Sequence, residues 1–217
     1  MDPRCVANRT AGAVIMRIPI IMTLILCVLM AIGITTVAVR TQGPVPITPI
    51  GEPLSALAFQ LHDANGAKVT AESLRGKISI LYFGYTFCPD VCPTELAWMT
   101  RVLHALGSQA SQIQPILVGL DPERDTPARL RDYAAMFDTR IRAVTGSVDE
   151  VTTAATACGV GFRKSTPVSK SPGFYLIDHS MSTIVLNRDG RIAFRVQSRD
   201  STPDQAAAQI RTLLEHP

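Results

Sequence analysis

Beyond residue 40 the chain lacks an excess of charge of either sign. Residues 1–40 hold four arginines and one aspartate, which leaves 17 of the 21 basic side chains and 17 of the 18 acidic ones in residues 41–217. This later part also lacks a run of Lys or Arg. Nucleic-acid binding depends on such a basic cluster. The charge balance therefore excludes that class of protein.

Internal repeats and low-complexity segments are absent too. A chain of 217 residues is long enough for one domain with a hydrophobic core and a short additional segment. A content of 47% hydrophobic and 18% charged residues excludes a disordered chain. We therefore expect one folded domain.

One segment, Ile18–Val39, contains no Asp, Glu, Lys or Arg. Its 22 residues match the roughly 20 that a helix needs to cross a bilayer. Arg4, Arg9 and Arg17 precede it, which places the N-terminus in the cytoplasm by the positive-inside rule. We expect a single-pass anchor with a cytoplasmic segment at 1–17 and the rest of the chain outside.

A cleaved signal peptide is the alternative for this segment. Its apolar core would usually span about 7–15 residues, fewer than observed here. Thr36-Val37-Ala38 nevertheless resembles a cleavage site, so the alternative stays open, whereas Leu-Ile-Leu before Cys27 lacks the small residue needed for lipidation. The short basic N-terminus has no Arg/Ser-rich transit segment, which favours a bacterial inner membrane with the C-terminal domain in the periplasm.

The rest of the chain divides into a spacer and a domain. Four prolines and two glycines between Thr41 and Pro53 predict a semi-rigid extended linker, 40–53. The domain then occupies 54–217. Short apolar runs of β-forming residues predict its strands, and apolar residues at helical spacing predict its helices. The expected strands are 78–83, 116–120, 174–178, 182–186 and 192–196, and the expected helices start near Pro93, Thr126 and Thr202.

The order of these elements is a β-α-β half followed by a β-hairpin and a helix. Two cysteines lie just after the first central strand. This arrangement is that of a thioredoxin-like α/β fold, with a central mixed sheet and helices on both faces.

Cys88 and Cys92 are spaced i, i+4 where a strand turns into a helix, so both thiols can project from the same side of the first turn. A helix N-terminus lowers the pKa of a thiol and favours the thiolate. Thiolates serve both metal ligation and disulfide exchange, and the same spacing in an exported protein also fits a structural disulfide. The spacing alone does not distinguish a metal site, a redox-active pair and a structural disulfide.

Thiolates select soft ions such as Cu(I), and an imidazole would complete a three-ligand site. The four histidines differ in context. His216 is at the C-terminus, His62 is in an early hairpin-like stretch and His104 is in the middle of a helix. His179 directly follows an expected strand, at a loop from which it could reach a neighbouring turn. A solvated loop histidine is the alternative.

Four motifs together resemble one known family. They are Gly84-Tyr-Thr-Phe-Cys-Pro-Asp-Val-Cys-Pro93, Asp121-Pro-Glu-Arg-Asp-Thr-Pro127, Thr145-Gly-Ser147 and Asp178-His-Ser180. In order and spacing they are similar to the Sco/SenC family of copper proteins, which assist cytochrome c oxidase assembly. The resemblance covers about residues 52–217, and its first two motifs are highly specific.

The resemblance implies that Cys88, Cys92 and His179 bind one copper ion, as Cu(I) or Cu(II). It also implies a metallochaperone rather than an enzyme. Such a protein delivers copper to the Cu-A centre of cytochrome c oxidase subunit II, reduces the cysteines of that subunit, or does both. Other copper chaperones or thiol reductants are further partners that it implies.

Two other functions fit part of the sequence. A metal-independent, membrane-tethered thiol–disulfide oxidoreductase explains Cys88 and Cys92 as a redox-active pair but leaves His179 without a role. A peroxiredoxin would carry its reactive cysteine three residues after a threonine, whereas Thr86 is two residues before Cys88. We rank the peroxiredoxin last.

Four further residues lie in or near these motifs. Asp121 and Asp125 are either carboxylates that face a metal or support its ligands or, as we prefer, structural residues. In the preferred reading Asp121 ends a strand, and Asp125 or Thr126 caps the next helix. Asp90 either tunes the thiolates or faces solvent. Cys158 is expected to be a small buried side chain rather than a third redox thiol.

Overall fold

A computed structural model describes residues 59–165 and 174–215. The predicted cytoplasmic segment, anchor and spacer, and the predicted start of the domain at residue 54, lie outside these residues. In the described ranges no helix combines the length and the apolar character that a membrane crossing requires.

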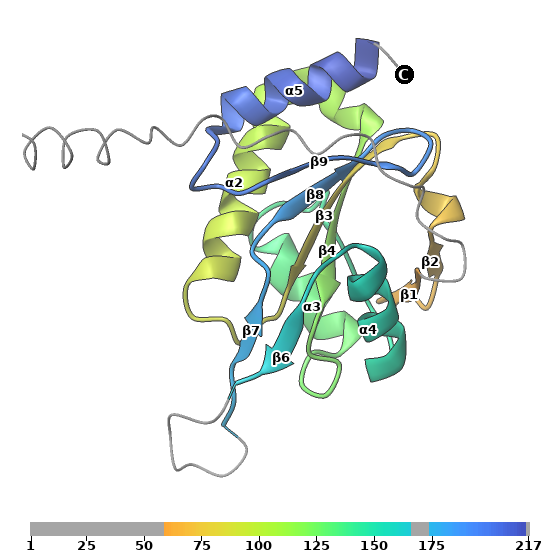
Figure 1. The fold of residues 1–217 in the computed structure, drawn as a ribbon, viewed down its shortest axis with the longest axis vertical. Helices are drawn as coiled ribbons and strands as arrows, with labels where there is room; N and C mark the ends of the chain where they lie inside the picture. Colours follow the sequence, from red (N-terminus) through yellow and green to blue (C-terminus); the bar gives the residue numbers. More distant parts are fainter. Residues whose placement is uncertain (1–58, 166–173, 216–217) are drawn as a thin grey trace, which may run out of the picture. The chain divides into compact units, whose positions relative to one another are not determined.

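The core of the described chain is a seven-stranded mixed sheet in the order β2-β1-β5-β4-β3-β8-β9 (Figure 1). Its strands are β1 (Gln60–Asp63), β2 (Lys68–Thr70), β3 (Ile78–Gly84), β4 (Ile113–Gly119), β5 (Arg142–Thr145), β8 (Thr183–Leu186) and β9 (Ile192–Val196). Strands β3, β4 and β5 are parallel, and β8 pairs antiparallel with β3. A separate two-stranded sheet joins β6 (Phe162–Lys164) to β7 (Ile177–His179).

The helices are α2 (Val91–Leu106), α3 (Pro127–Ala135), α4 (Val148–Ala157) and α5 (Pro203–Glu215), with 3-10 turns η1 (Glu72–Leu74) and η2 (Gly107–Gln112). Capping residues mark the starts of two of these helices. Thr126 caps α3 by accepting from the N–H of Arg129, with Pro127 at the first position. Thr202 and Gln205 form the reciprocal bonds of a capping box at α5.

The helices lie on both faces of the sheet, as expected. Gly84 and Gly119 are opposite each other in the parallel β3–β4 pair, so both point to one face. A Cβ atom at Gly84 would meet Cys92 of α2, and one at Gly119 would meet Leu130 of α3. Helices α2 and α3 therefore share a face, and α5 packs against α2 on it (Figure 1).

Helix α4 covers the opposite face. Leu120 points away from the face of Gly119 because successive residues of an extended chain alternate. It lines a small apolar cavity together with Val151 of α4. Every residue of β3 is buried, as a strand covered on both faces should be.

The structure corrects one strand boundary near the site. The expected strand 174–178 is observed as β7, Ile177–His179. The strand register with β6 runs from Ile177 to His179, and Leu176 accepts one further backbone hydrogen bond from Ser165. The rings of Phe174 and Tyr175 pack on other side chains. His179 is therefore the last residue of a strand and does not lie beyond its end.

Candidate metal centre

Cys88 and Cys92 lie where the chain passes from β3 into α2. Cys88 is half-buried in the connecting loop, and Cys92 is fully buried in the first turn of the helix. The N–H of Cys92 donates to the Sγ atom of Cys88 at 3.3 Å. Asp90 is the N-cap residue, but its side chain makes no capping bond. The sulfur of Cys88 thus accepts one of the free N–H groups that open the helix.

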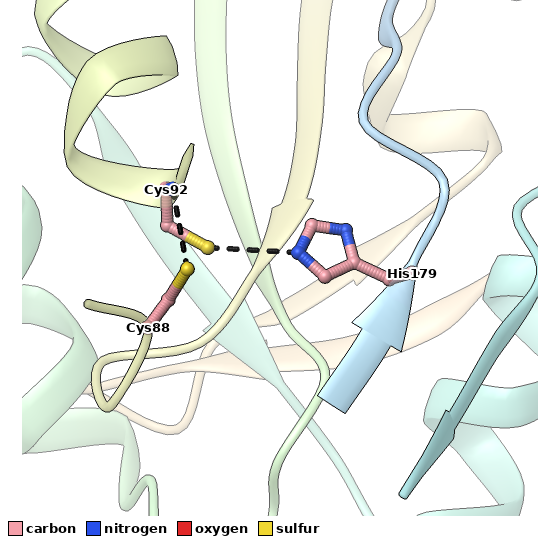
Figure 2. A group of neighbouring side chains, drawn as sticks. All are labelled: Cys88, Cys92 and His179. Carbon is pink, nitrogen blue, oxygen red and sulfur yellow. Dashed lines mark hydrogen bonds between the residues drawn. The ribbon is translucent and has the colours of Figure 1, made fainter. Parts of the chain in front are cut away.

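His179 approaches the two sulfurs from β7 (Figure 2). Its Nε2 atom is 3.6 Å from the Sγ atom of Cys92. Its Nδ1 atom is 2.9 Å from the carbonyl oxygen of Ser180, which can only accept a hydrogen bond. The proton of the neutral ring therefore belongs on Nδ1, and the lone pair of Nε2 faces the sulfurs. This is the tautomer and orientation of a metal-ligating histidine.

The three side chains converge closely enough to hold one ion. Their ligand atoms all lie within 4.8 Å of one another, and together they are the group of potential metal ligands found in the described residues. Two thiolates and one imidazole are the donors that Cu(I) and other soft ions prefer. The donor set therefore fits the copper expected from the sequence.

The two thiols differ in acidity. The hydrogen bond from the Cys92 side chain, with a smaller contribution from the neighbouring His179 ring, outweighs partial burial and lowers the pKa of Cys88 to about 3. The bond to Cys88 and the burial of Cys92 raise the pKa of the Cys92 thiol well above its usual range. Cys88 is therefore the thiolate of the pair, and Cys92 holds the shared proton.

Aromatic rings enclose the imidazole. Tyr82 and Tyr85 meet the His179 ring edge-on, with ring centroids 6.2 and 6.0 Å away. Gly84 lies between the two tyrosines, and a Cβ atom there would come within 2.8 Å of the Tyr82 ring and 3.1 Å of the Cys92 sulfur. Only glycine lets the strand pass this close to the site.

Of the two residues expected to cap α3, Thr126 does so and Asp125 does not. Asp121 lies just after the end of β4, as expected. Both carboxylates are buried, and burial raises the pKa of Asp125. Asp125 accepts two hydrogen bonds from Thr86, and Asp121 accepts one from the Tyr175 hydroxyl. They do not join the metal-ligand group but hold the segments that carry it.

The other residues singled out in the sequence lie apart from the centre. Cys158 is a free, fully buried side chain at the C-terminal end of α4, as expected. His62 belongs to the β1–β2 hairpin, and His104 is exposed on α2. Asp90 is exposed at the start of α2.

Sequence reasoning missed three residues around the centre. Arg124 stacks on Tyr175, and Tyr85 accepts a hydrogen bond from the backbone N–H of Ile177. Each contact joins segments at least 51 residues apart, so no local pattern reports it. The one available signal was the presence of Tyr85 and Arg124 inside the two motifs.

Fold and site together define a class: a thioredoxin-like domain with a Cys-x-x-x-Cys and histidine metal centre. The sequence model of the SCO1/SenC family matches residues 49–215. The chain belongs to the SCO1/SenC family.

Individual relatives agree with this assignment. Protein sco1 of Schizosaccharomyces pombe is 32% identical over 170 residues, which is 78% of this chain and 64% of that protein. Protein SCO1, mitochondrial, of Saccharomyces cerevisiae is 39% identical over 143 residues, 65% of this chain and 48% of that protein. The chain thus spans less than two thirds of the length of these relatives.

A solved structure has the same fold. The structure of Bradyrhizobium japonicum ScoI with copper bound superposes with a TM-score of 0.66 at 38% sequence identity. The match covers 76% of this chain and 99% of that one.

Proposed function

We propose that this protein binds one copper ion through Cys88, Cys92 and His179 and acts as a copper-binding assembly factor for cytochrome c oxidase. The observation that carries the proposal is the convergence of two thiols and a correctly oriented imidazole within 4.8 Å. Membership of the SCO1/SenC family and the copper-bound ScoI structure support it.

The site suits an ion that must later be passed on. Cys92 is fully buried and His179 is held by its bond to Ser180, so these two ligands are fixed in the domain. Cys88 is half-buried in a loop, so an incoming ligand of a partner can approach the ion on that side. A three-ligand site also leaves room for ligand exchange. The ion is cargo in this account, as Cu(I) or Cu(II).

The recipient that we infer is the Cu-A centre of cytochrome c oxidase subunit II. Other copper chaperones or thiol reductants would act before it, and reduction of the subunit's cysteines is compatible with the same cysteine pair. We infer further that Ile18–Val39 anchors the protein in a bacterial inner membrane, with the domain in the periplasm. The lack of charge in this segment supports the inference.

A metal-independent thiol–disulfide oxidoreductase is the second candidate. The unequal acidity of the cysteines favours it, because a thiolate at Cys88 would attack a substrate disulfide and form a mixed disulfide. Cys92 would then lose its proton, attack Cys88 and release the reduced substrate. This chemistry has no use for the imidazole as a ligand.

The variant His179→Ala separates the two functions. Loss of one ligand of three should weaken copper retention against a competing chelator by about tenfold or more. Reduction of a disulfide substrate through Cys88 and Cys92 should continue. Cys88→Ser serves as the comparison, because it should abolish both activities. Unchanged copper retention in His179→Ala would favour the oxidoreductase.

A further inference from the structure

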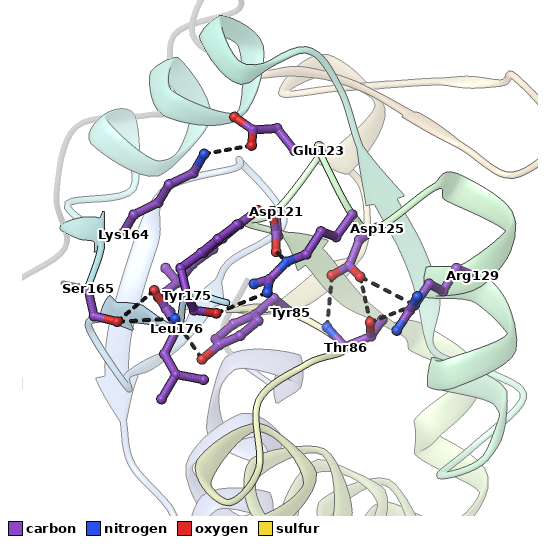
Figure 3. A network of polar contacts seen from close by, with 12 residues as sticks. Tyr85, Thr86, Asp121, Glu123, Asp125, Arg129, Lys164, Ser165, Tyr175 and Leu176 are labelled. Atoms are coloured by element: carbon purple, nitrogen blue, oxygen red, sulfur yellow. Dashed lines mark hydrogen bonds and ion pairs between the residues drawn. The ribbon is translucent and has the colours of Figure 1, made fainter. Parts of the chain in front are cut away.

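The turn at 121–125 connects β4 to α3, and its C-terminal end holds the cysteine loop. Asp125 accepts the Thr86 N–H at 2.8 Å and the Thr86 hydroxyl at 2.5 Å (Figure 3). Thr86 is two residues before Cys88. Asp125 has no exposed surface, so these bonds are shielded from water. Asp125 therefore holds the backbone of the cysteine loop two residues before Cys88.

Two other residues of the same turn, Asp121 and Arg124, hold the segment that leads to His179. The Nη1 group of Arg124 donates to the Tyr175 carbonyl oxygen at 2.9 Å, and the guanidinium lies 3.6 Å from the centroid of the Tyr175 ring. Asp121 accepts from Arg124 and, at 2.7 Å, from the Tyr175 hydroxyl. Tyr175 is thus held by its ring, its hydroxyl and its backbone, four residues before His179.

Arg124 also reaches the cysteine loop directly. Its guanidinium carbon is 5.0 Å from the ring centroid of Phe87 and 6.0 Å from that of Tyr85. Tyr85 completes the connection, because its hydroxyl accepts the Ile177 N–H at 3.1 Å. Loop and strand are therefore joined twice, once through Arg124 and once through Tyr85.

We propose that Arg124 is a positioning residue, which fixes the strand of His179 against the loop of Cys88 and so sets the distance from the imidazole to the sulfurs. The proposal rests on the copper-binding function above. Residues that orient metal ligands typically change metal affinity by about 10- to 100-fold when replaced. Arg124 would do so without touching the ion.

The guanidinium group is needed for this role. It donates from Nε to Asp121 and from Nη1 to Tyr175 while its flat face lies on a ring. A lysine at position 124 would keep the charge but lose the fork of donors and the flat stacking face. Arg124→Lys therefore tests the geometry at constant charge.

The experiment measures Cu(I) retention of the full chain against a chelator in four proteins: the unchanged chain, Arg124→Lys, His179→Ala and the double variant. We expect Arg124→Lys to weaken retention about tenfold when His179 is present and to change nothing in the His179→Ala background. An equal loss in both backgrounds, or no loss in either, would overturn the proposal.

Arg163→Lys is the matched control. Arg163 is also an arginine near the site, and it pairs with Asp178, the neighbour of His179, at 3.3 Å. It is 81% exposed, and its ion-pair partner Asp178 lies outside the cysteine loop. Copper retention should be unchanged. A loss equal to that of Arg124→Lys would contradict a specific role for Arg124.

A metal-free measurement separates this proposal from the proposed function. In the apo protein, nuclear Overhauser contacts between the rings of His179 and Tyr85 should be present and should weaken in Arg124→Lys. Their persistence would refute positioning even if copper binds as proposed. If His179→Ala retains copper normally, the function fails while this readout still decides the role of Arg124.

A second variant covers the case in which Arg124→Lys does not fold. Tyr175→Phe keeps the ring under the guanidinium and removes only the hydroxyl that donates to Asp121. It should weaken the same ring contact and the copper retention, by less than Arg124→Lys. No change in either quantity would count against the proposal.

Discussion

At the scale of single residues, the two cysteines of one motif have different physical roles. Cys92 is fully buried beneath Gly84 and Tyr82, and its pKa is raised. Cys88 is partly exposed at the helix start, where the hydrogen bond from the Cys92 side chain and the neighbouring His179 ring lower its pKa. Cys88 is therefore the more accessible and more acidic of the two thiols.

The low pKa of Cys88 predicts its alkylation kinetics. A thiol with a pKa of about 3 is already a thiolate at pH 5. Its alkylation rate, followed by mass spectrometry of the Cys88 peptide in the apo protein, should be nearly constant from about pH 5 to 8, whereas an ordinary thiol of pKa ~8.5 gains about tenfold per pH unit.

Cys92→Ala provides the control for this profile. It removes the side chain whose hydrogen bond contributes most to the lowering of the Cys88 pKa. The pKa should rise, and a pH-dependent rate should return. A rate in the unchanged protein that climbs tenfold per pH unit up to pH 8 would contradict the assignment of the thiolate to Cys88.

The sequence predicted the three side chains of the candidate site better than it predicted the residues that hold them in place. The spacing of Cys88 and Cys92 and the position of His179 could be identified along the chain, and the family resemblance joined them into one site. Asp125 and Arg124 were visible in a motif, yet their partners Thr86 and Tyr175 are 39 and 51 residues away. Only the fold brings these groups together.

At the scale of elements, the strand-to-helix unit that carries the cysteines depends on the last helix. The Trp98 side chain of α2 donates to the Ser201 carbonyl at 2.9 Å, one residue before the cap of α5. Glu95 of α2 accepts from the N–H and hydroxyl of Ser198 at 3.1 and 2.5 Å. The segment before α5 thus holds α2, the helix that carries Cys92, through these hydrogen bonds.

The cap of α5 should contribute measurably to stability. Thr202→Ala removes the hydroxyl that accepts the Gln205 N–H at 3.2 Å, and should lower the free energy of unfolding by about 1 kcal/mol. Urea denaturation measures this change. Thr212→Ala is the matched control, because Thr212 lies inside α5 and bonds only to its own helix at Ala208. Equal losses in both variants would argue against the capping box.

Elements were predicted well where a local signal was strong. Continuous apolar runs revealed β3 and most of β4, and Thr126 and Thr202 marked the starts of α3 and α5. The start of helix α4 was not predicted because its sequence is rich in Thr and Ala without a wide apolar stripe, although Ser147 and Glu150 form a capping box that could have indicated it. The predicted start of β7 was wrong because the rings of Phe174 and Tyr175 pack on other side chains and these residues do not pair with β6.

At the scale of the whole molecule, the fold brings His179 to the cysteine loop, where Cys92 is 87 residues away along the chain. The cysteine loop follows the C-terminal end of β3, and the chain returns through β7 near the same end of the sheet, because the next strand, β8, runs antiparallel to β3. The mixed sheet and its two helical layers followed from the order of elements in the sequence. The position of β7 relative to the cysteine loop did not follow from this order, because it depends on contacts between the turn at 121–125 and Tyr175.

The membrane topology is a separate prediction. Arg4, Arg9 and Arg17 precede the apolar segment, so a reporter fused after Pro217 that functions only when exported should be active. A fusion with these three arginines moved to the C-terminal side of the segment is the control and should lose activity. A reporter that works only in the cytoplasm would contradict the proposed anchor.

The central claim is that Cys88, Cys92 and His179 hold one copper ion. X-ray absorption spectroscopy of the full chain, loaded with Cu(I) and freed of excess metal, tests it most directly. The account predicts one copper per chain with two sulfur ligands and one nitrogen ligand, and loss of the nitrogen in His179→Ala. A copper site with sulfur ligands alone in the unchanged protein, or a nitrogen that persists in His179→Ala, would contradict it.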